Sequence, residues 1–300
     1  MRLAVVGAGG QLAAAVVHEC RAAHDVVAFI RSELDVTDDA AVAAAMERTR
    51  PQVIVNGAAF TDVDGAEDRP VEALNVNAFA VRALARAAAA LDAALIHFST
   101  DFVFDGHASA PYTESDAPNP RSVYAASKLL GEWFALDAPQ GYVLRVETLF
   151  GRAPDSDAPP RGSVAGIVAA LLAGIPARVF EDRTISPTYI PDAARAVRYI
   201  IDERPPAGLY HCVNSGRCTW VELAQALADG LGVEPRLQRT KMAETMLRAA
   251  RPLYCALAND KLRAAGVDMP AWQDALTRYV RSLTTGRPPA QVLHPEKARG

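Results

Sequence analysis

Short apolar runs alternate with helical stretches along the first half of the chain. Apolar runs without polar alternation are typical of strands in a parallel sheet, because helices bury both faces of such a sheet. We predict strands at 3–6, 26–30, 53–59, 95–98 and 142–147. The alternation of strand and helix predicts an α/β fold, a doubly wound parallel sheet of the Rossmann type.

The second half of the chain has a different pattern. Residues 152–162 are typical of an irregular loop, and the polar end 284–300 is expected to fray. We predict helices at 162–173, 191–202 and, capped by Thr219, up to Leu231, with strands at 177–180 and 208–214. We therefore expect an NAD(P)-binding domain of residues 1–151, with a return segment at about 185–214. A smaller C-terminal substrate domain would comprise residues 152–184 and 215–300.

A glycine-rich turn follows the first predicted strand: Gly7-Ala8-Gly9-Gly10-Gln11-Leu12-Ala13. A strand, a glycine turn and a helix in this order open a dinucleotide-binding fold, because glycine lets the backbone approach a pyrophosphate at the helix N-terminus. The spacing is G-x-x-G-x-x-A, and a plain strand–helix turn is the alternative interpretation.

Arg31 follows the second predicted strand, where an acidic residue would hold the ribose 2′-hydroxyl of NAD. A guanidinium suits a 2′-phosphate and favours NADP, whereas a solvated arginine would leave NAD open. Asp35 and Val36 could face an adenine, and Thr37 or Asp38 would cap the next helix. Capping is the alternative interpretation for any acid in this segment.

The residues after the fourth predicted strand carry the candidate chemistry. That strand delivers Ser99 and Thr100 to its carboxyl end, where open α/β sheets bind ligands. Tyr124 and Lys128 share one helix face. The lysine ammonium is expected to lower the pKa of the phenol, which would suit proton transfer to an oxygen that Thr100 also binds. Taken alone, Tyr-x-x-x-Lys also fits a packed tyrosine beside a snorkelling lysine.

Two polar residues lie within apolar patterns. Asn77 falls within the apolar stripe of a helix predicted at 72–91, and we expect it to bond backbone or water near the site. His211 points inward in the strand at 208–214, so we interpret it as a core residue rather than a catalyst.

Composition narrows the function classes. The 300 residues carry a formal charge of −4 without a basic cluster, which argues against a nucleic-acid surface. We expect neither a signal peptide nor a membrane span. The four cysteines lack metal-ligand spacing, so we expect reduced core thiols, no metal and a cytoplasmic protein.

Taken together, these residues resemble the extended short-chain dehydrogenase/reductase family and, within it, the dTDP-4-dehydrorhamnose reductase family. The matching stretches span nearly the whole chain: 7–12, 56–64, 99–106, Tyr124-x-x-x-Lys128, 144–145, 186–189, Gly208-x-Tyr210-His211 and 251–252. The Ser-Thr-Asp-x-Val-Phe-Asp-Gly block with Tyr-x-x-x-Lys is specific for this branch, whereas the glycine turn is not.

The resemblance implies a site and a reaction. Thr100, Tyr124 and Lys128 would be the catalytic trio. The sugar would contact Thr100, Asp101, Phe102 and Thr148. NADPH, or alternatively NAD, would contact Gly7, Gly10, Gln11, Leu12, Arg31, Asp35, Val36, Ala58, Ala59, Phe60, Ser99, Tyr124 and Lys128. Hydride would pass to C4 of a nucleotide-linked 4-keto-6-deoxy sugar, with dTDP-4-dehydrorhamnose as the first candidate, and Tyr124 would protonate the alkoxide.

Three segments depart from the family pattern. Phe102 and Phe60 replace tyrosines, and Arg145-Val146-Glu147-Thr148 stands where Arg-Thr-Ser-Trp is common. The sugar pocket is therefore expected to lack an aromatic wall and a hydroxyl, and to gain an acid.

Other function classes stay open. A sugar-nucleotide epimerase of this fold would retain NAD, and a dehydratase would carry Asp-Glu after the catalytic threonine, where this chain has Asp101-Phe102. A non-catalytic NADP-binding regulatory protein, like the regulatory subunit of methionine adenosyltransferase, would not need the trio. For the reductase we expect a nucleotide-sugar substrate, no nucleic acid and no membrane, and we leave a homodimer open.

Overall fold

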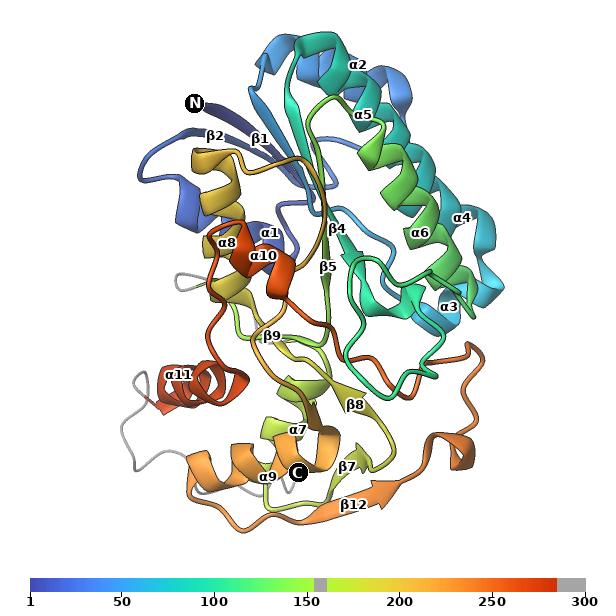
Figure 1. Cartoon of the computed structure of the whole chain (residues 1–300), viewed down its shortest axis with the longest axis vertical. Helices are drawn as coiled ribbons and strands as arrows, with labels where there is room; N and C mark the ends of the chain where they lie inside the picture. The colour runs from blue at the N-terminus through green and yellow to red at the C-terminus, as the bar shows by residue number, and fades with distance from the viewer. Residues whose placement is uncertain (154–160, 285–300) are drawn as a thin grey trace, which may run out of the picture.

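The computed structural model describes residues 1–153 and 161–284. Six parallel strands form a central sheet in the order β10-β5-β4-β3-β1-β2 (Figure 1). They are β1 Arg2–Val6, β2 Asp25–Phe29, β3 Val53–Asn56, β4 Ala94–Thr100, β5 Gly141–Val146 and β10 Gly208–His211. The sheet confirms the doubly wound α/β fold, and β10 shows the chain returning to the sheet beside β5.

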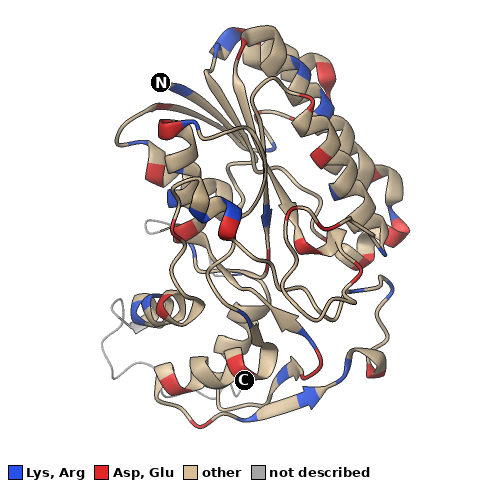
Figure 2. Ribbon diagram, viewed as in Figure 1, with Lys and Arg blue, Asp and Glu red and all other residues tan. Residues whose placement is uncertain are grey.

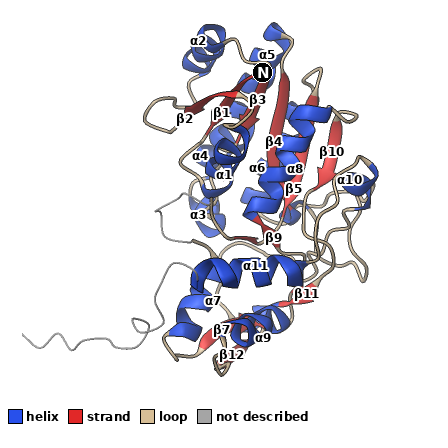
Figure 3. Ribbon diagram, turned by 90° about the vertical axis from the view of Figure 1, so that its left-hand side faces the viewer, coloured by secondary structure: helices blue, strands red, loops and turns tan. Residues whose placement is uncertain are grey.

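Helices cover both faces of this sheet (Figures 1 and 3). On one face α1 (Gln11–Cys20) packs against α8 (Ile190–Glu203), with α10 (Asp260–Ala264) nearby. The other face carries α2 (Asp39–Thr49), α5 (Ala80–Leu91) and α6 (Val123–Leu136). One apolar cluster on each face buries the strand side chains, which explains the unbroken apolar runs in the sequence.

A second, smaller core lies beyond the carboxyl ends of the strands (Figure 1). It is enclosed by α7 (Ser163–Leu172), α9 (Trp220–Leu231) and α11 (Trp272–Thr284). The short parallel pairs are β7 (Ala177–Phe180) with β12 (Leu237–Thr240), and β6 (Leu149–Phe150) with β9 (Thr188–Tyr189). An antiparallel pair joins β8 (Thr184–Ile185) to β11 (Cys218–Thr219).

Several predicted elements of this second part are confirmed. Residues 163–172 and 220–231 are helical, and Thr219 caps the second of these helices with a capping box. Neither α11 nor β12 was predicted. The division into two domains stays a prediction, and most of the predicted loop at 152–162 and nearly all of the end at 284–300 lie outside the described residues.

The helix predicted at 72–91 is interrupted by a π-helical turn. It consists of α4 (Pro70–Leu74), the turn at Asn75–Phe79, and α5, and it follows α3 (Val63–Asp68). Such turns shift the helical register locally, and they often occur at functional sites. The helical spacing of apolar residues predicts one continuous helix here, so it does not reveal the interruption.

Asn77, within that turn, is fully buried. Its Nδ2 donates to the Phe60 carbonyl and to Ser127 Oγ, both at 3.0 Å, and its Oδ1 accepts from the Phe60 amide at 2.9 Å. Gly131 of α6 lies against the same residue, and a Cβ there would stand 2.1 Å from the Asn77 carbonyl oxygen. The expectation that Asn77 bonds backbone near the site is confirmed.

The prediction that His211 is a core residue is confirmed. His211 is fully buried, with Nδ1 3.1 Å from the Ala258 carbonyl, and burial lowers its pKa to about 3, which leaves it a neutral core residue. The four cysteines are buried and free. Charges of both signs are interspersed on the side shown in Figure 2. Within residues 1–153 and 161–284, no helix is long and apolar enough to cross a membrane.

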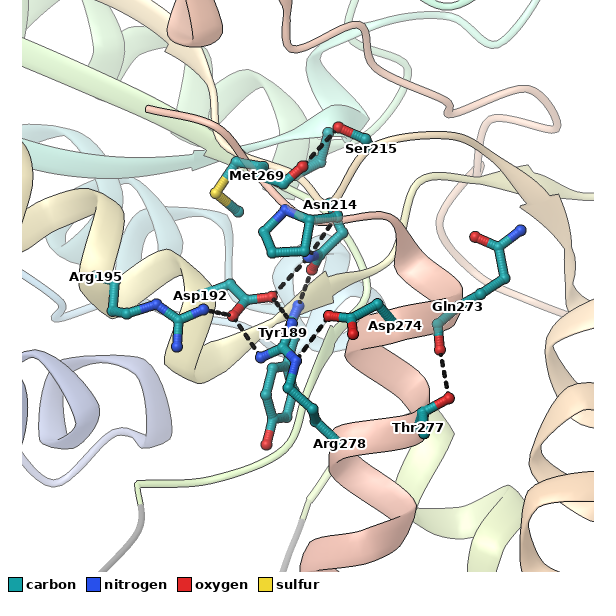
Figure 4. Close-up of polar contacts among 12 residues, drawn as sticks. Tyr189, Asp192, Arg195, Asn214, Ser215, Met269, Gln273, Asp274, Thr277 and Arg278 are labelled. Carbon is teal, nitrogen blue, oxygen red and sulfur yellow. Dashed lines mark hydrogen bonds and ion pairs between the residues drawn. The ribbon is translucent and has the colours of Figure 1, made fainter. Parts of the chain in front are cut away.

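A buried ionic network joins the second core to the sheet (Figure 4). The Asp192 carboxylate, on α8, is fully buried and accepts two bonds of 2.7 Å from Arg278 on α11. Arg195 also pairs with it, and Asn214 Nδ2 donates to it at 2.7 Å. Asn214 Oδ1 in turn accepts from the Tyr189 amide at 2.7 Å. Asp192 therefore holds α11 and the strand ends in one place.

Replacing Asp192 with alanine would remove the carboxylate that Arg195 and Arg278 share. Arg278 would keep its bond to Asp274. We expect Asp192→Ala to lower the free energy of unfolding by roughly 3 kcal/mol, measured by urea denaturation. Asp260→Ala, which breaks the exposed pair with Arg263, is the control and should cost less than about 1 kcal/mol. Equal stability of the two variants would contradict this role of Asp192.

Candidate active site

A cavity at the carboxyl ends of β1 and β3 brings together most of the predicted cofactor residues. It is lined by Gly7, Gly10, Arg31, Asp35, Val36, Ala58, Ala59 and Phe60, all of which the sequence singled out. Gly7 has φ +71°, and a Cβ there would lie 2.4 Å from the Ala58 amide nitrogen, so this turn requires glycine. Gly10, which lines the cavity, is the N-cap of α1, and no side chain caps the first amides of this helix. These features fit a dinucleotide pyrophosphate.

The other predicted cofactor residues lie elsewhere. Gln11, Ser99 and Tyr124 line the neighbouring cavity described next. Leu12 is buried in the apolar core and lines neither cavity, and neither does Lys128. Asp38, not Thr37, caps α2 by accepting from the Ala41 amide.

A second cavity contains the candidate catalytic and sugar-contacting side chains. Thr100, Asp101, Phe102, Tyr124 and Thr148 all line it. The register of the sheet explains part of this grouping, because Thr100 of β4 pairs with Val146 of β5 and the residues that follow leave the same edge. The Phe102 ring stands edge-on to the Tyr124 ring, with centroids 5.9 Å apart.

The Tyr124 phenol stays protonated at neutral pH. Burial raises its pKa to about 12, and the nearby Asp101 charge adds to the rise, while a hydrogen bond with Thr100 opposes it. The expected lowering of the Tyr124 pKa by Lys128 is therefore wrong for this structure. The reason is that desolvation of the phenolate dominates.

Lys128 is held in a buried polar chain on the helix that carries Tyr124. Its Nζ donates to the Phe98 carbonyl at 2.6 Å and lies 3.5 Å from His97 Nε2. His97 Nδ1 is 3.0 Å from Asn56 Nδ2. Burial lowers the pKa of Lys128 to about 8. Sequence reasoning missed His97 and Asn56, although a histidine inside an apolar strand is a signal for a buried polar contact.

The second cavity is also lined by arginine and tryptophan side chains that were not predicted. They are Arg161, Arg183, Trp220 and Arg251. Trp220 supplies an aromatic side chain from α9, although the sequence near Thr148 was expected to leave the pocket without an aromatic wall. Arg251 belongs to the matching stretch 251–252, but no role in the site was predicted for it. No local motif surrounds Arg161, Arg183 or Trp220, so only the fold could bring them to the site.

Comparison with known proteins gives the family. Residues 1–285 match the model described as the RmlD substrate binding domain. The chain belongs to this family. It is 35% identical over 273 residues to a dTDP-4-dehydrorhamnose reductase of Streptomyces griseus, covering 88% of each protein. The resemblance stated from the sequence motifs is thereby confirmed.

Solved structures agree with this assignment. A dTDP-4-dehydrorhamnose reductase of Clostridium acetobutylicum has a TM-score of 0.88 at 31% identity, with 94% of this chain and 99% of that chain covered. The enzyme of the same name from Bacillus anthracis, solved in complex with NADP, has a TM-score of 0.85 at 29% identity, with 93% and 98% covered. The family fold therefore extends over both cavities.

Asn77 should be required for cofactor binding, because it fixes the Phe60 segment beside the dinucleotide cavity. We expect Asn77→Leu to weaken NADPH binding by roughly tenfold, about 1.4 kcal/mol, as measured by quenching of protein fluorescence. Asn75→Leu, at an exposed position of the same turn, is the matched control. If both variants bind NADPH like the unsubstituted protein, Asn77 does not hold the cofactor loop.

Proposed function

We propose that this protein uses NADPH to reduce the 4-keto group of a nucleotide-linked 4-keto-6-deoxy sugar. The first candidate reaction is dTDP-4-dehydrorhamnose to dTDP-L-rhamnose, which the names of its reductase relatives support. The observation that carries the proposal is that Thr100 and Tyr124 meet in a cavity next to the dinucleotide cavity. A cytoplasmic location stays a prediction, and the homodimer stays open.

The site residues are suited to protonating a developing alkoxide. Bound NADPH supplies the hydride. Tyr124, which keeps its proton, donates it to the oxygen that was the ketone, and Thr100 holds that oxygen by a hydrogen bond. Lys128 lies one helical turn after Tyr124 on the same face of the helix. Its Nζ is buried and donates to the Phe98 carbonyl. A reduction needs the phenol in its protonated form, because the phenol gives its proton to the substrate oxygen.

A third cavity supports a nucleotide-linked substrate. It is continuous with the sugar cavity, since Ser163, Arg183, Trp220 and Arg251 line both. Arg178 also lines this third cavity. Guanidinium groups bind phosphate oxygens bidentately, and an indole can stack on a base, so this cavity suits a nucleoside diphosphate. The base itself stays open.

Arg31 supports NADPH as the preferred cofactor. It is exposed at the end of β2 and lines the dinucleotide cavity where the adenosine ribose would lie. A guanidinium can pair with the 2′-phosphate, which NAD lacks.

Tyr124→Phe removes the donated proton and keeps the ring. We expect kcat for dTDP-4-dehydrorhamnose reduction to fall by roughly 100-fold or more, with the Kd for NADPH little changed. NADPH oxidation in the presence of freshly made keto sugar measures the first, and fluorescence titration measures the second. The control is Tyr142→Phe, whose hydroxyl bonds the Pro205 carbonyl outside the site. Full turnover by Tyr124→Phe would refute the assigned role of Tyr124. In the unsubstituted protein, NAD that stays bound through purification would favour an epimerase.

Arg31→Ala should change cofactor preference rather than chemistry. Because only NADPH carries the 2′-phosphate, we expect its KM to rise roughly tenfold, about 1.4 kcal/mol, while the KM for NADH stays the same. Arg48→Ala, an exposed arginine on α2 away from the cavity, serves as control. A parallel loss with both cofactors would mean that Arg31 does not bind the phosphate.

A further inference from the structure

Residues 241–252 form a strap that follows β12 and contacts α3 in the first half of the chain (Figure 1). The point of attachment on α3 is the carboxylate of Asp64. Its Oδ1 accepts from the backbone amides of Arg248 at 3.1 Å and Ala249 at 2.9 Å. Arg248 also pairs with Asp68, one helical turn further along α3. The strap is therefore fixed to α3 by two carboxylates.

The Asp64 carboxylate also holds the side chain of Arg251. Arg251 Nη1 donates to Oδ1 at 3.0 Å and Nη2 donates to Oδ2 at 2.9 Å, which makes a bidentate pair. Nη1 donates in addition to the Ala249 carbonyl at 3.2 Å. The bonds from Arg251, and with them those from the strap amides, lower the pKa of Asp64 to about 2. Asp64 therefore stays ionised and paired at neutral pH.

Two N–H groups of Arg251 have no acceptor within residues 1–153 and 161–284. A guanidinium carries five N–H groups, and the bonds to Asp64 and Ala249 use both hydrogens of Nη1 and one of Nη2. The Nε–H and the second Nη2–H are left, and they lie on the same edge of the planar group. Two parallel donors on one edge form the fork that binds two oxygens of one phosphate.

Arg251 lies where the sugar cavity and the third cavity meet, since it lines both. Its side chain is 16% exposed, so a ligand can reach it. In a nucleotide-linked sugar the diphosphate joins the sugar to the nucleoside. With the sugar in the cavity that contains Tyr124 and the nucleoside in the third cavity, the diphosphate lies at this junction.

Among the described residues that line both cavities, the other arginine is Arg183, and its donors and charge are already engaged. Its Nε donates to the Pro252 carbonyl and its Nη2 to Cys255 Sγ, both at 3.0 Å. Its charge acts on two buried acids of the sugar cavity, Asp101 and Glu147. An ionised carboxylate beside Arg183 would repel a phosphate. Arg251 is therefore the better diphosphate ligand at the junction.

We propose that Asp64 is a positioning residue that holds the open edge of Arg251 toward the diphosphate of the nucleotide-linked sugar. The proposal rests on the function proposed above, because it takes that sugar as the ligand. Asp64 lines neither the dinucleotide cavity, the sugar cavity nor the third cavity, and it acts through Arg251.

Asp64 has two opposite effects on a bound diphosphate. Its negative charge repels the phosphates, whereas its bonds keep the guanidinium and the strap in the arrangement that binding requires. We expect the second effect to dominate, because Asp64 holds both the Arg251 side chain and the backbone amides that precede it.

Asp64→Ala tests which effect decides. We expect the Kd for thymidine diphosphate, measured by isothermal titration calorimetry, to rise roughly tenfold. The KM for dTDP-4-dehydrorhamnose should rise by a similar factor, while kcat at saturating sugar stays nearly the same because Tyr124 is untouched. An unchanged Kd for NADPH shows that the variant is folded. If Asp64→Ala binds thymidine diphosphate equally well or more tightly, the proposal is wrong.

A double-substitution cycle distinguishes a positioning role from a merely structural one. In an Arg251→Ala background, Asp64→Ala should weaken thymidine diphosphate binding no further, because Asp64 acts through Arg251. The same loss with and without Arg251 would mean that Asp64 only holds the strap, and it would overturn the proposal. Asp68→Ala is the matched control, since it removes an exposed pair between the same helix and strap and should leave the Kd nearly unchanged.

The outcomes separate this proposal from the one before it, because thymidine diphosphate binding is measured without turnover. If the cycle gives the expected coupling but the protein reduces no keto sugar, the reductase function is wrong and the diphosphate site stands. If the protein is an active reductase and the cycle shows no coupling, the positioning role of Asp64 is wrong and the reductase function stands. Failure of the unsubstituted protein to bind thymidine diphosphate would overturn the diphosphate site.

Discussion

The placement of the site depends on the side-chain amide of Asn77. With three hydrogen bonds it fixes both the Phe60 backbone, beside the dinucleotide cavity, and Ser127, on the helix that carries Tyr124 and Lys128. A buried amide left without partners would be costly, so the segments must keep their separation for the residue to stay inside. The π-helical turn supplies the register that points this side chain inward.

The parallel sheet then determines which residues meet. Adjacent strands end together, so the residues after β4 and β5 form one edge. That edge places Thr100 and Asp101 beside Glu147, while α6 brings Tyr124 over it. The smaller core closes the far side with Arg183 and Trp220, and Asp192 holds that core in place through Arg278. The residues at the ends of β4 and β5 thus both build the sheet edge and carry the candidate chemistry.

Much of this could be predicted because it is encoded locally. The glycine turn at Gly7, the spacing of Tyr124 and Lys128, and the cap at Thr219 each depend on residues a few positions apart. In the structure, each of these motifs lies at or within the helix that the sequence predicted for it. The strands of the main sheet followed from their apolar runs, because burial on both faces leaves a simple pattern.

What failed depends on contacts between distant residues. Lys128 meets His97, which lies 31 positions earlier, and this contact cannot be read from a four-residue motif. The pKa of Tyr124 follows from burial, which spacing does not report. Arg183 and Trp220 reach the cavity from separate elements of the smaller core. The π-turn at Asn75–Phe79 keeps an apolar stripe, so its extra residue is invisible to periodicity.

Gly131 has a consequence for how relatives of this protein should be judged. It carries no reactive group, yet any side chain there would strike the Asn77 carbonyl and push α6 outward. A homologue could keep threonine, tyrosine and lysine intact and still have lost their alignment through one methyl group at this position. Surveys that infer activity from these three residues alone would count such a protein as an enzyme. The residue at this helix crossing is therefore a diagnostic as informative as the reacting groups themselves.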